Sequence, residues 1–276
     1  MRKHPGEWAL ITGASRGLGR AFAEECAKMG YDLLLVSLPD EGLGRLGARI
    51  SETWAVRCRI MEADLAETEA GERVLALAET ETDRLALLVN NAGIGRYGAF
   101  GEASFTFHRS VVELNIQSTM GLTYALLPLL ARGAPSRILT VASLAAFQPM
   151  PLFATYAASK AFLKSWGMAL AEELGPLGIG STVLAPGGIY TSEQVRAQAR
   201  SQGLAGYLST QEPEKVARIA LERAERGQVL VVPGIFNRLV AFVSGLVPDR
   251  IKARAVYGQW KRALARAGAE GAGRSL

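Results

Sequence analysis

The sequence predicts an α/β protein whose core is a doubly wound parallel sheet of about seven strands, covered by helices on both faces to give three layers. Short, nearly continuous runs of Val, Leu and Ile alternate with longer segments of helical periodicity, which is the pattern of parallel strands buried on both faces. The 276 residues are 49% hydrophobic and 21% charged. This balance is that of an ordinary globular domain and excludes disordered, collagen-like and coiled-coil chains.

The first third of the chain predicts strands alternating with helices. Apolar runs indicate strands at residues 8–11, 32–37, 56–62 and 85–89, and amphipathic spacing indicates helices at 18–29, 42–54 and 67–80. The first helix is expected to stop at Gly30, because glycine is a common residue just past a helix end. In a sheet of this kind ligands bind beyond the carboxyl ends of the strands, so the loops that follow each strand are the candidates for chemistry.

The remaining residues continue the alternation and end in an appendage. Helices at 107–130 and 155–174 lead into strands at 137–141 and 180–184, and a seventh strand is expected at 229–232. No repeat or linker divides the chain, so residues 1–232 are interpreted as the main unit. Residues 233–276 are interpreted as an apolar helix and a basic tail of the same domain.

The net charge of +5 comes entirely from the last part of the chain. Residues 249–276 set seven basic side chains against two acidic ones, and the rest of the chain is neutral: Arg250, Lys252, Arg254, Lys261, Arg262, Arg266 and Arg274 against Asp249 and Glu270. A nucleic-acid-binding protein usually spreads its basic residues over a face of the fold, so nucleic-acid binding is not expected. The tail is interpreted as solvated surface.

The apolar segment at residues 235–247 has two interpretations. An apolar helix with a cationic flank can seat a protein on an anionic membrane surface or dock an acidic acyl carrier. We favour a helix that covers the pocket or a subunit interface. No apolar run reaches the roughly 18 residues of a membrane span, and the first residues lack a signal-peptide core, so a cytoplasmic location is expected.

A glycine-rich loop follows the first predicted strand and opens the first helix. Its glycines would let the backbone approach a pyrophosphate and place it on the helix amino terminus. Glycine also occurs in ordinary turns, so the position of the loop between strand and helix carries the interpretation. The loop residues are Gly13, Ser15, Arg16, Gly17, Leu18 and Gly19.

Two further loops are candidates for nucleotide contacts. Asn91, Ala92 and Gly93 end the fourth strand, where small residues leave room for a nucleotide and an asparagine can tie neighbouring loops together. Asp64 and Leu65 follow the third strand. Asp64 is equally suited to accept from an adenine amino group or to cap the helix that follows.

Tyr156 and Lys160 form the candidate chemical centre. Four positions apart on one predicted helix, their side chains share a face and one site. A phenol has a pKa near 10, and a neighbouring ammonium favours phenolate, so Lys160 is expected to lower the pKa of Tyr156. Ser143, at the end of the fifth strand, is placed to hydrogen-bond a substrate oxygen, or alternatively to cap a turn. Asn115 is polar among apolar neighbours and is expected to face something buried and polar.

Taken in order, these motifs resemble those of the short-chain dehydrogenase/reductase family over residues 8–232. The resemblance implies a nicotinamide-dependent oxidoreductase with a Rossmann fold, in which residues 1–232 form the dinucleotide-binding catalytic domain. It makes Tyr156 the acid/base, with Lys160 lowering its pKa and holding the nicotinamide ribose. It also implies that Ser143 orients the substrate oxygen, that Asn115 holds a relay water, and that the protein is a homo-oligomer. Further cofactor contacts would come from Pro186, Gly187, Ile189 and Thr191.

The end of the second strand predicts NADP(H) in preference to NAD(H). Users of NAD usually carry an acid there, which binds the ribose 2′-hydroxyl and repels a 2′-phosphate. This chain has Ser37 and Leu38 at that point, while Arg16 offers a guanidinium to a phosphate. Leu38 departs from the second basic residue that many NADP users have at this point.

The loops expected to bind substrate, at residues 94–98, 144–155 and 192–206, are mostly apolar. Phe147, Met150, Leu152 and Phe153 precede the tyrosine and predict a fatty acyl, steroid-like or other bulky carbonyl substrate, unless they belong to the core. The sequence therefore predicts an enzyme that interconverts ketones and secondary alcohols. The alternatives are a non-catalytic NAD(P)-sensing regulatory protein, which has no need to keep the tyrosine and lysine, and a methyltransferase on a similar sheet.

Overall fold

A seven-stranded parallel sheet organises the described part of the chain, with strand order β3-β2-β1-β4-β5-β6-β7. The computed structural model describes residues 3–39, 42–190 and 203–258. The order reverses between β1 and β4, which opens the ligand crevice of a doubly wound sheet at that point. The strands are β1 (Trp8–Thr12), β2 (Asp32–Ser37), β3 (Cys58–Glu62), β4 (Leu87–Asn90), β5 (Ser136–Val141), β6 (Ile179–Leu184) and β7 (Leu230–Val231).

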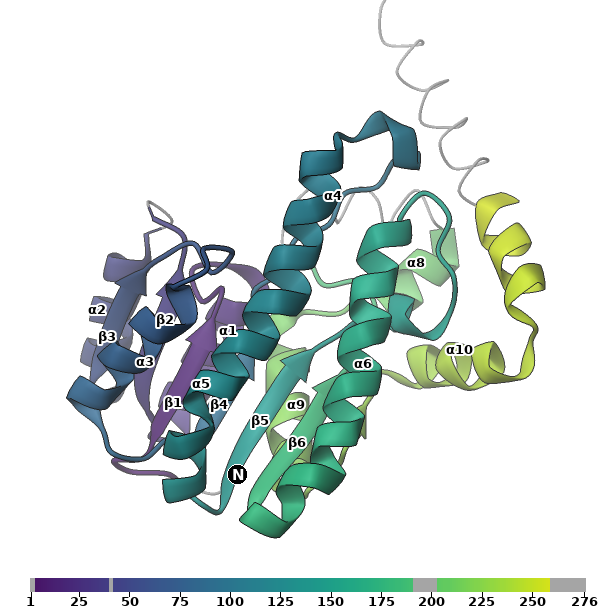
Figure 1. The fold of residues 1–276 in the computed structure, drawn as a ribbon. Helices are drawn as coiled ribbons and strands as arrows, with labels where there is room; N and C mark the ends of the chain where they lie inside the picture. Colours follow the sequence, from purple (N-terminus) through teal and green to yellow (C-terminus); the bar gives the residue numbers. More distant parts are fainter. Residues whose placement is uncertain (1–2, 40–41, 191–202, 259–276) are drawn as a thin grey trace, which may run out of the picture.

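Helices cover both faces of this sheet, so the predicted three-layer fold is confirmed (Figure 1). Buried residues of α1, α2 and α9 share one core cluster with the sheet, and those of α3 and α5 share another. The helix α6 packs on β6. The helices are α1 (Gly17–Lys28), α2 (Leu43–Trp54), α3 (Ala70–Glu81), α4 (Phe105–Val112), α5 (Ser118–Arg132), α6 (Ala154–Leu174), α8 (Gly203–Ser209), α9 (Pro213–Glu225) and α10 (Ile235–Leu246).

Three features of the fold differ from the sequence prediction. The helix α9, which packs on α1, and the short α8 are not among the predicted elements. The predicted helix 107–130 is two helices, because a π-helical turn at Glu113–Gln117 separates α4 from α5. The apolar sequence around Cys26 and Cys58 predicts two core thiols, and Cys26 is one of them. Cys58 is only half-buried, because β3 is the edge strand of the sheet and one side of it is open.

The C-terminal helix α10 lies at the side of the molecule away from β3 and packs against α8 and the turn Leu144–Phe147 (Figure 1). Its large apolar side chains are mostly exposed, and none of them lines the cavity described below. The expected subunit interface stays a prediction. Within the described residues no helix is both long and apolar enough for a membrane span.

Candidate active site

The loop between β1 and α1 forms a tight cradle, and its three glycine positions do not accept a side chain. Gly13 and Gly17 adopt positive φ angles of 62° and 55°, which side chains rarely accept. A Cβ on Gly19 would lie 2.0 Å from the carbonyl oxygen of Gly13. The N-cap residue Arg16 makes no side-chain capping hydrogen bond, and the amino terminus of a helix presents N–H groups that suit an anion.

The loop after β4 is tied to this cradle through Thr12 and Asn91. The Oγ1 atom of Thr12 accepts from the backbone N–H groups of Asn91 and Ala92 at 2.9 and 3.0 Å. The Nδ2 atom of Asn91 donates to the Thr12 carbonyl at 2.9 Å. These bonds fix the two loops to each other on either side of the sheet's switch point, as expected of the asparagine.

The end of β2 forms the far rim of the cradle. The Ser37 hydroxyl donates to the Ser15 hydroxyl at 2.8 Å, and Leu38 and Arg16 are exposed beside them. Asp64 uses Oδ1 to accept from the N–H of Ala66 at 2.9 Å, which is a local turn bond. This bond resembles the predicted capping role more than an adenine contact, although α3 begins only at Ala70. The neighbouring Leu65 is buried in the core.

The predicted catalytic side chains come together beyond the ends of β4 and β5. Lys160 lies with Nζ 5.7 Å from the centre of the Tyr156 ring, and the Ser143 hydroxyl lies close enough to the tyrosine hydroxyl to lower its pKa. A Cβ on Gly93 would lie 3.0 Å from Asn115 Oδ1 and 3.3 Å from Lys160 Nζ. The asparagine, the lysine and the backbone of the β4 loop therefore meet at one point.

Asn115 is held there by the π-helical turn, and it is fully buried. Its Oδ1 accepts from the N–H of Ile94 at 2.8 Å, and its Nδ2 donates to the Ile94 carbonyl at 3.0 Å and to Ser159 Oγ at 2.9 Å. A π turn widens the helix by a residue and often marks a functional position. The buried polar surroundings predicted for Asn115 are thus the β4 loop and the helix that carries Tyr156.

Burial governs the ionisation of both Tyr156 and Lys160. It raises the pKa of Tyr156 to about 12, against a smaller lowering by the Ser143 hydrogen bond. It lowers the pKa of Lys160 to about 8, and Nζ donates to the Val141 carbonyl at 2.8 Å. The protein's own described groups therefore keep the phenol protonated at neutral pH, the opposite of the predicted direction, and this state suits a proton donor.

Aromatic rings support one side of Tyr156. The Phe153 ring stacks on it with centroids 4.2 Å apart, and Tyr97 stacks on Phe153 at 3.8 Å. The backbone of Gly95 lies against the ring, since a Cβ there would come within 2.4 Å of Tyr156 Cδ2. The orientation of the phenol is thus set by close packing.

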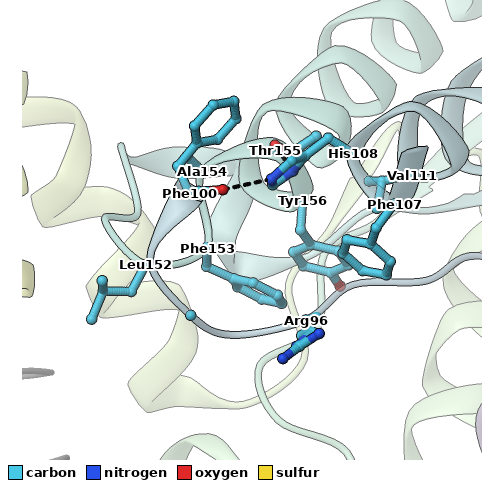
Figure 2. Close-up of a pocket in the computed structure, with 11 residues that line it drawn as sticks. Arg96, Phe100, Phe107, His108, Val111, Leu152, Phe153, Ala154, Thr155 and Tyr156 are labelled. Atoms are coloured by element: carbon cyan, nitrogen blue, oxygen red, sulfur yellow. Dashed lines mark hydrogen bonds between the residues drawn. The ribbon is translucent and has the colours of Figure 1, made fainter. Parts of the chain in front are cut away.

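A cavity of about 50 Å³ opens beside Tyr156 (Figure 2). The predicted Leu152 and Phe153 line it, together with the α4 residues Phe107 and His108, which sequence reasoning did not select. His108 contacts the Thr155 hydroxyl at 2.9 Å and the Phe100 carbonyl at 2.9 Å. The described lining is only part of the predicted substrate site, since residues 191–202 lie outside the described residues.

The loop after β6 approaches the site from the other side. The Pro186 carbonyl accepts from the N–H of Leu144 at 2.7 Å, next to Ser143. A Cβ on Gly187 would lie 2.3 Å from the Ser209 carbonyl, and Ile189 forms a bridge with Gln211. Thr191 lies outside the described residues, so its predicted contact stays a prediction.

The family model for short chain dehydrogenases matches residues 7–202 of this chain. Because this is well over half of the chain, the protein belongs to the short-chain dehydrogenase family, and the resemblance read from its motifs is confirmed.

Relatives and solved structures agree with this membership. Very-long-chain 3-oxoacyl-CoA reductase of Phaeosphaeria nodorum is 35% identical over 178 residues, which are 63% of this chain and 52% of that protein. Hydroxysteroid dehydrogenase-like protein 1 of Gallus gallus is 30% identical over 246 residues, which are 88% of this chain and 72% of that protein. The chain thus spans about half the length of the fungal reductase. L-Sorbose reductase from Gluconobacter frateurii, complexed with NADPH and L-sorbose, has a TM-score of 0.75 at 26% identity and covers 85% of this chain and 98% of its own.

Proposed function

We propose that this protein is an NADP(H)-dependent oxidoreductase that interconverts a ketone and a secondary alcohol on a largely apolar substrate, with Tyr156 as the acid/base. The observation that carries the proposal is the meeting of Tyr156, Ser143, Lys160 and Asn115 beside a glycine cradle. Hydroxyl, phenol and ammonium in one buried site are the groups that a carbonyl reduction needs.

The cradle suits a dinucleotide because positive φ angles at Gly13 and Gly17 fold the loop tightly at the amino terminus of α1. The backbone of Gly13 to Gly19 and the first N–H groups of α1 would hold the pyrophosphate. Lys160 and the Asn91–Gly93 loop would hold the nicotinamide ribose, and the residues from Pro186 to Thr191 the nicotinamide. When bound, a reduced nicotinamide supplies hydride to the substrate carbonyl carbon.

The preference for NADP(H) is supported by the rim of the cradle. Arg16 is exposed at the start of α1, and Ser37 and Leu38 stand where an acid would repel a 2′-phosphate. The structurally similar L-sorbose reductase is complexed with NADPH, which is compatible with this choice. The ratio of kcat/KM with NADPH to that with NADH measures it, and a preference for NADH of about tenfold, or 1.4 kcal/mol, would refute it.

In the direction of reduction Tyr156 donates its phenolic proton to the substrate oxygen. Its pKa of about 12 keeps the proton in place until negative charge develops on that oxygen. The Ser143 hydroxyl, which lies beside the phenol, would donate its proton in a second hydrogen bond to the same oxygen. The Lys160 ammonium stabilises the phenolate that remains, and Asn115 fixes the backbone of the β4 loop beside it.

An apolar substrate is supported by the lining of the cavity, where Leu152, Phe153, Phe107 and Val111 gather. It is also supported by the names of two relatives, which refer to very-long-chain 3-oxoacyl-CoA and to hydroxysteroids. The similar L-sorbose reductase is complexed with a polar sugar, L-sorbose, so the fold alone does not select between polar and apolar substrates.

The proposal is tested by NADPH oxidation with a panel of bulky ketones, 3-oxoacyl thioesters and sugars. We expect turnover of apolar ketones or thioesters, and a loss of about 100-fold or more in kcat/KM for Ser143→Ala with little change in the Kd of NADPH. No turnover of any carbonyl by the wild-type chain, or full activity of Ser143→Ala, would contradict it. Sedimentation of the same sample tests the homo-oligomer that the family resemblance implies.

A further inference from the structure

The helix α10 exposes its large apolar side chains to solvent, whereas an ordinary surface helix buries them. Its large apolar side chains are the exposed ones: Ile235 is 79% exposed, Leu239 57%, Phe242 66%, Val243 44% and Leu246 70%. At 100° per residue these positions fall on one continuous face of the helix. The arrangement is a property of the helix as a whole and not of one stray side chain.

Polar residues occupy the opposite, buried face. Asn237 is fully buried and donates from Nδ2 to the carbonyl oxygens of Pro233 and Ser209 at 2.9 and 3.0 Å. Ser244 is 5% exposed and donates to Gln148 Oε1 at 3.2 Å. These bonds attach α10 to α8 and to the turn after β5, so its rotation about its own axis is fixed with the apolar face outward.

Exposed basic residues lie on this helix and on the segment that follows it. Arg238 is exposed on α10 itself, and Arg250 and Arg254 are exposed on the helical segment 249–258 that follows (Figure 1). The chain's whole net charge of +5 falls within residues 249–276. An exposed apolar helix face with arginines on the same and the following segment is typical of a helix that lies in a bilayer interface, with aliphatic side chains among the lipid tails and arginines at the headgroups.

We propose that α10 and the segment 249–258 form a peripheral binding surface for an anionic lipid bilayer. A second copy of the chain is a poorer occupant, because a two-fold contact would bring the arginines of both copies into one interface, and α10 has no acidic residue to pair with them. An acidic protein would satisfy the charges, but it would need a groove for a protruding helix whose face offers it no hydrogen-bonding group. A fluid lipid bilayer can receive the protruding helix without such a groove.

Co-flotation of the full chain with vesicles tests this surface. We expect binding to phosphatidylcholine vesicles that contain phosphatidylserine, weaker binding to phosphatidylcholine alone, and a decrease with salt. The double variant Leu239→Gln, Phe242→Gln should bind at least about tenfold more weakly, and so should the triple variant Arg238→Gln, Arg250→Gln, Arg254→Gln. Tyr124→Gln on α5, which removes an aromatic ring that is 79% exposed, is the matched control and should bind like the wild type.

Three results would overturn the proposal. One is no binding of the wild-type chain to anionic vesicles, and another is equal loss in the Tyr124→Gln control, which would indicate general adhesion. The third is sedimentation showing that Leu239→Gln, Phe242→Gln dissociates an oligomer, since the face would then be a contact between copies. NADPH binding and thermal unfolding of each variant report that it is folded, and they are independent of the proposed reaction.

Discussion

Replacing Gly95 by alanine should misplace Tyr156 without changing the chemistry of any group that takes part in the reaction. The added Cβ would lie 2.4 Å from Cδ2 and 2.9 Å from Cγ of the tyrosine ring, whereas ordinary contacts begin at 3.4 Å. Gly95 has no positive φ, so the backbone accepts alanine and the strain falls on the ring. The ring must retreat by about 1 Å, and a misplacement of that size at a catalytic group costs about 100-fold in rate.

The assay is kcat for ketone reduction together with the Kd of NADPH. For Gly95→Ala we expect kcat to fall about 100-fold while the Kd changes less than about threefold, because Gly95 faces the ring and not the glycine cradle. Gly101→Ala is the matched control, since its Cβ would meet nothing within 4 Å, and it should behave as wild type. A Gly95→Ala chain with wild-type kcat would show that close packing does not set the position of the phenol.

Three further predictions follow from the same contacts. Lys160→Met should abolish turnover yet raise the free energy of unfolding at pH 7 by up to about 3 kcal/mol, since burial lowers the pKa of Lys160 from 10.5 to about 8 and each pKa unit is about 1.36 kcal/mol. As the pH rises, the folded chain loses the Lys160 proton before the unfolded chain does, so the stability gained by Lys160→Met should shrink between about pH 8 and 10.5. Urea unfolding measures this free energy. A variant less stable than the wild type at pH 7 would contradict the prediction. Asn115→Ala should cost about 2–4 kcal/mol, because the Ile94 backbone groups and Ser159 lose their partner; a cost below about 1 kcal/mol in urea unfolding would refute this. Thr12→Val should weaken NADPH binding about tenfold, because the N–H groups of Asn91 and Ala92 lose their acceptor; calorimetric titration with an unchanged Kd would exclude it.

The sequence was sufficient for the sheet because the central strands, such as β1, β2 and β4, are short runs rich in Leu, Ile and Val and buried on both faces. It was not sufficient for α9, whose buried residues Val216, Ala217, Ala220 and Leu221 have helical spacing but are separated by charged residues. Proline at its first position is the signal that could have found it. The exposed edge of β3 could not be read from the sequence, because it depends on strand order.

The candidate site shows the same division between local and tertiary information. The spacing of Tyr156 and Lys160 predicts that they share a face, since this follows from helix geometry alone. The direction in which the pKa of Tyr156 moves depends on how much protein covers it, and that is a property of packed loops. His108 was passed over because its partners, Thr155 and Phe100, are brought to it by the fold.

The role of Tyr156 as proton donor is tested most directly by following deuterium from NADPH labelled at the nicotinamide C4 position into the alcohol formed from a bulky ketone. The wild-type chain should place the label on the former carbonyl carbon. Tyr156→Phe should bind NADPH with an unchanged Kd and form labelled alcohol about 1000-fold more slowly or not at all. Labelled alcohol appearing at a similar rate from Tyr156→Phe would contradict the assignment of the proton to this phenol.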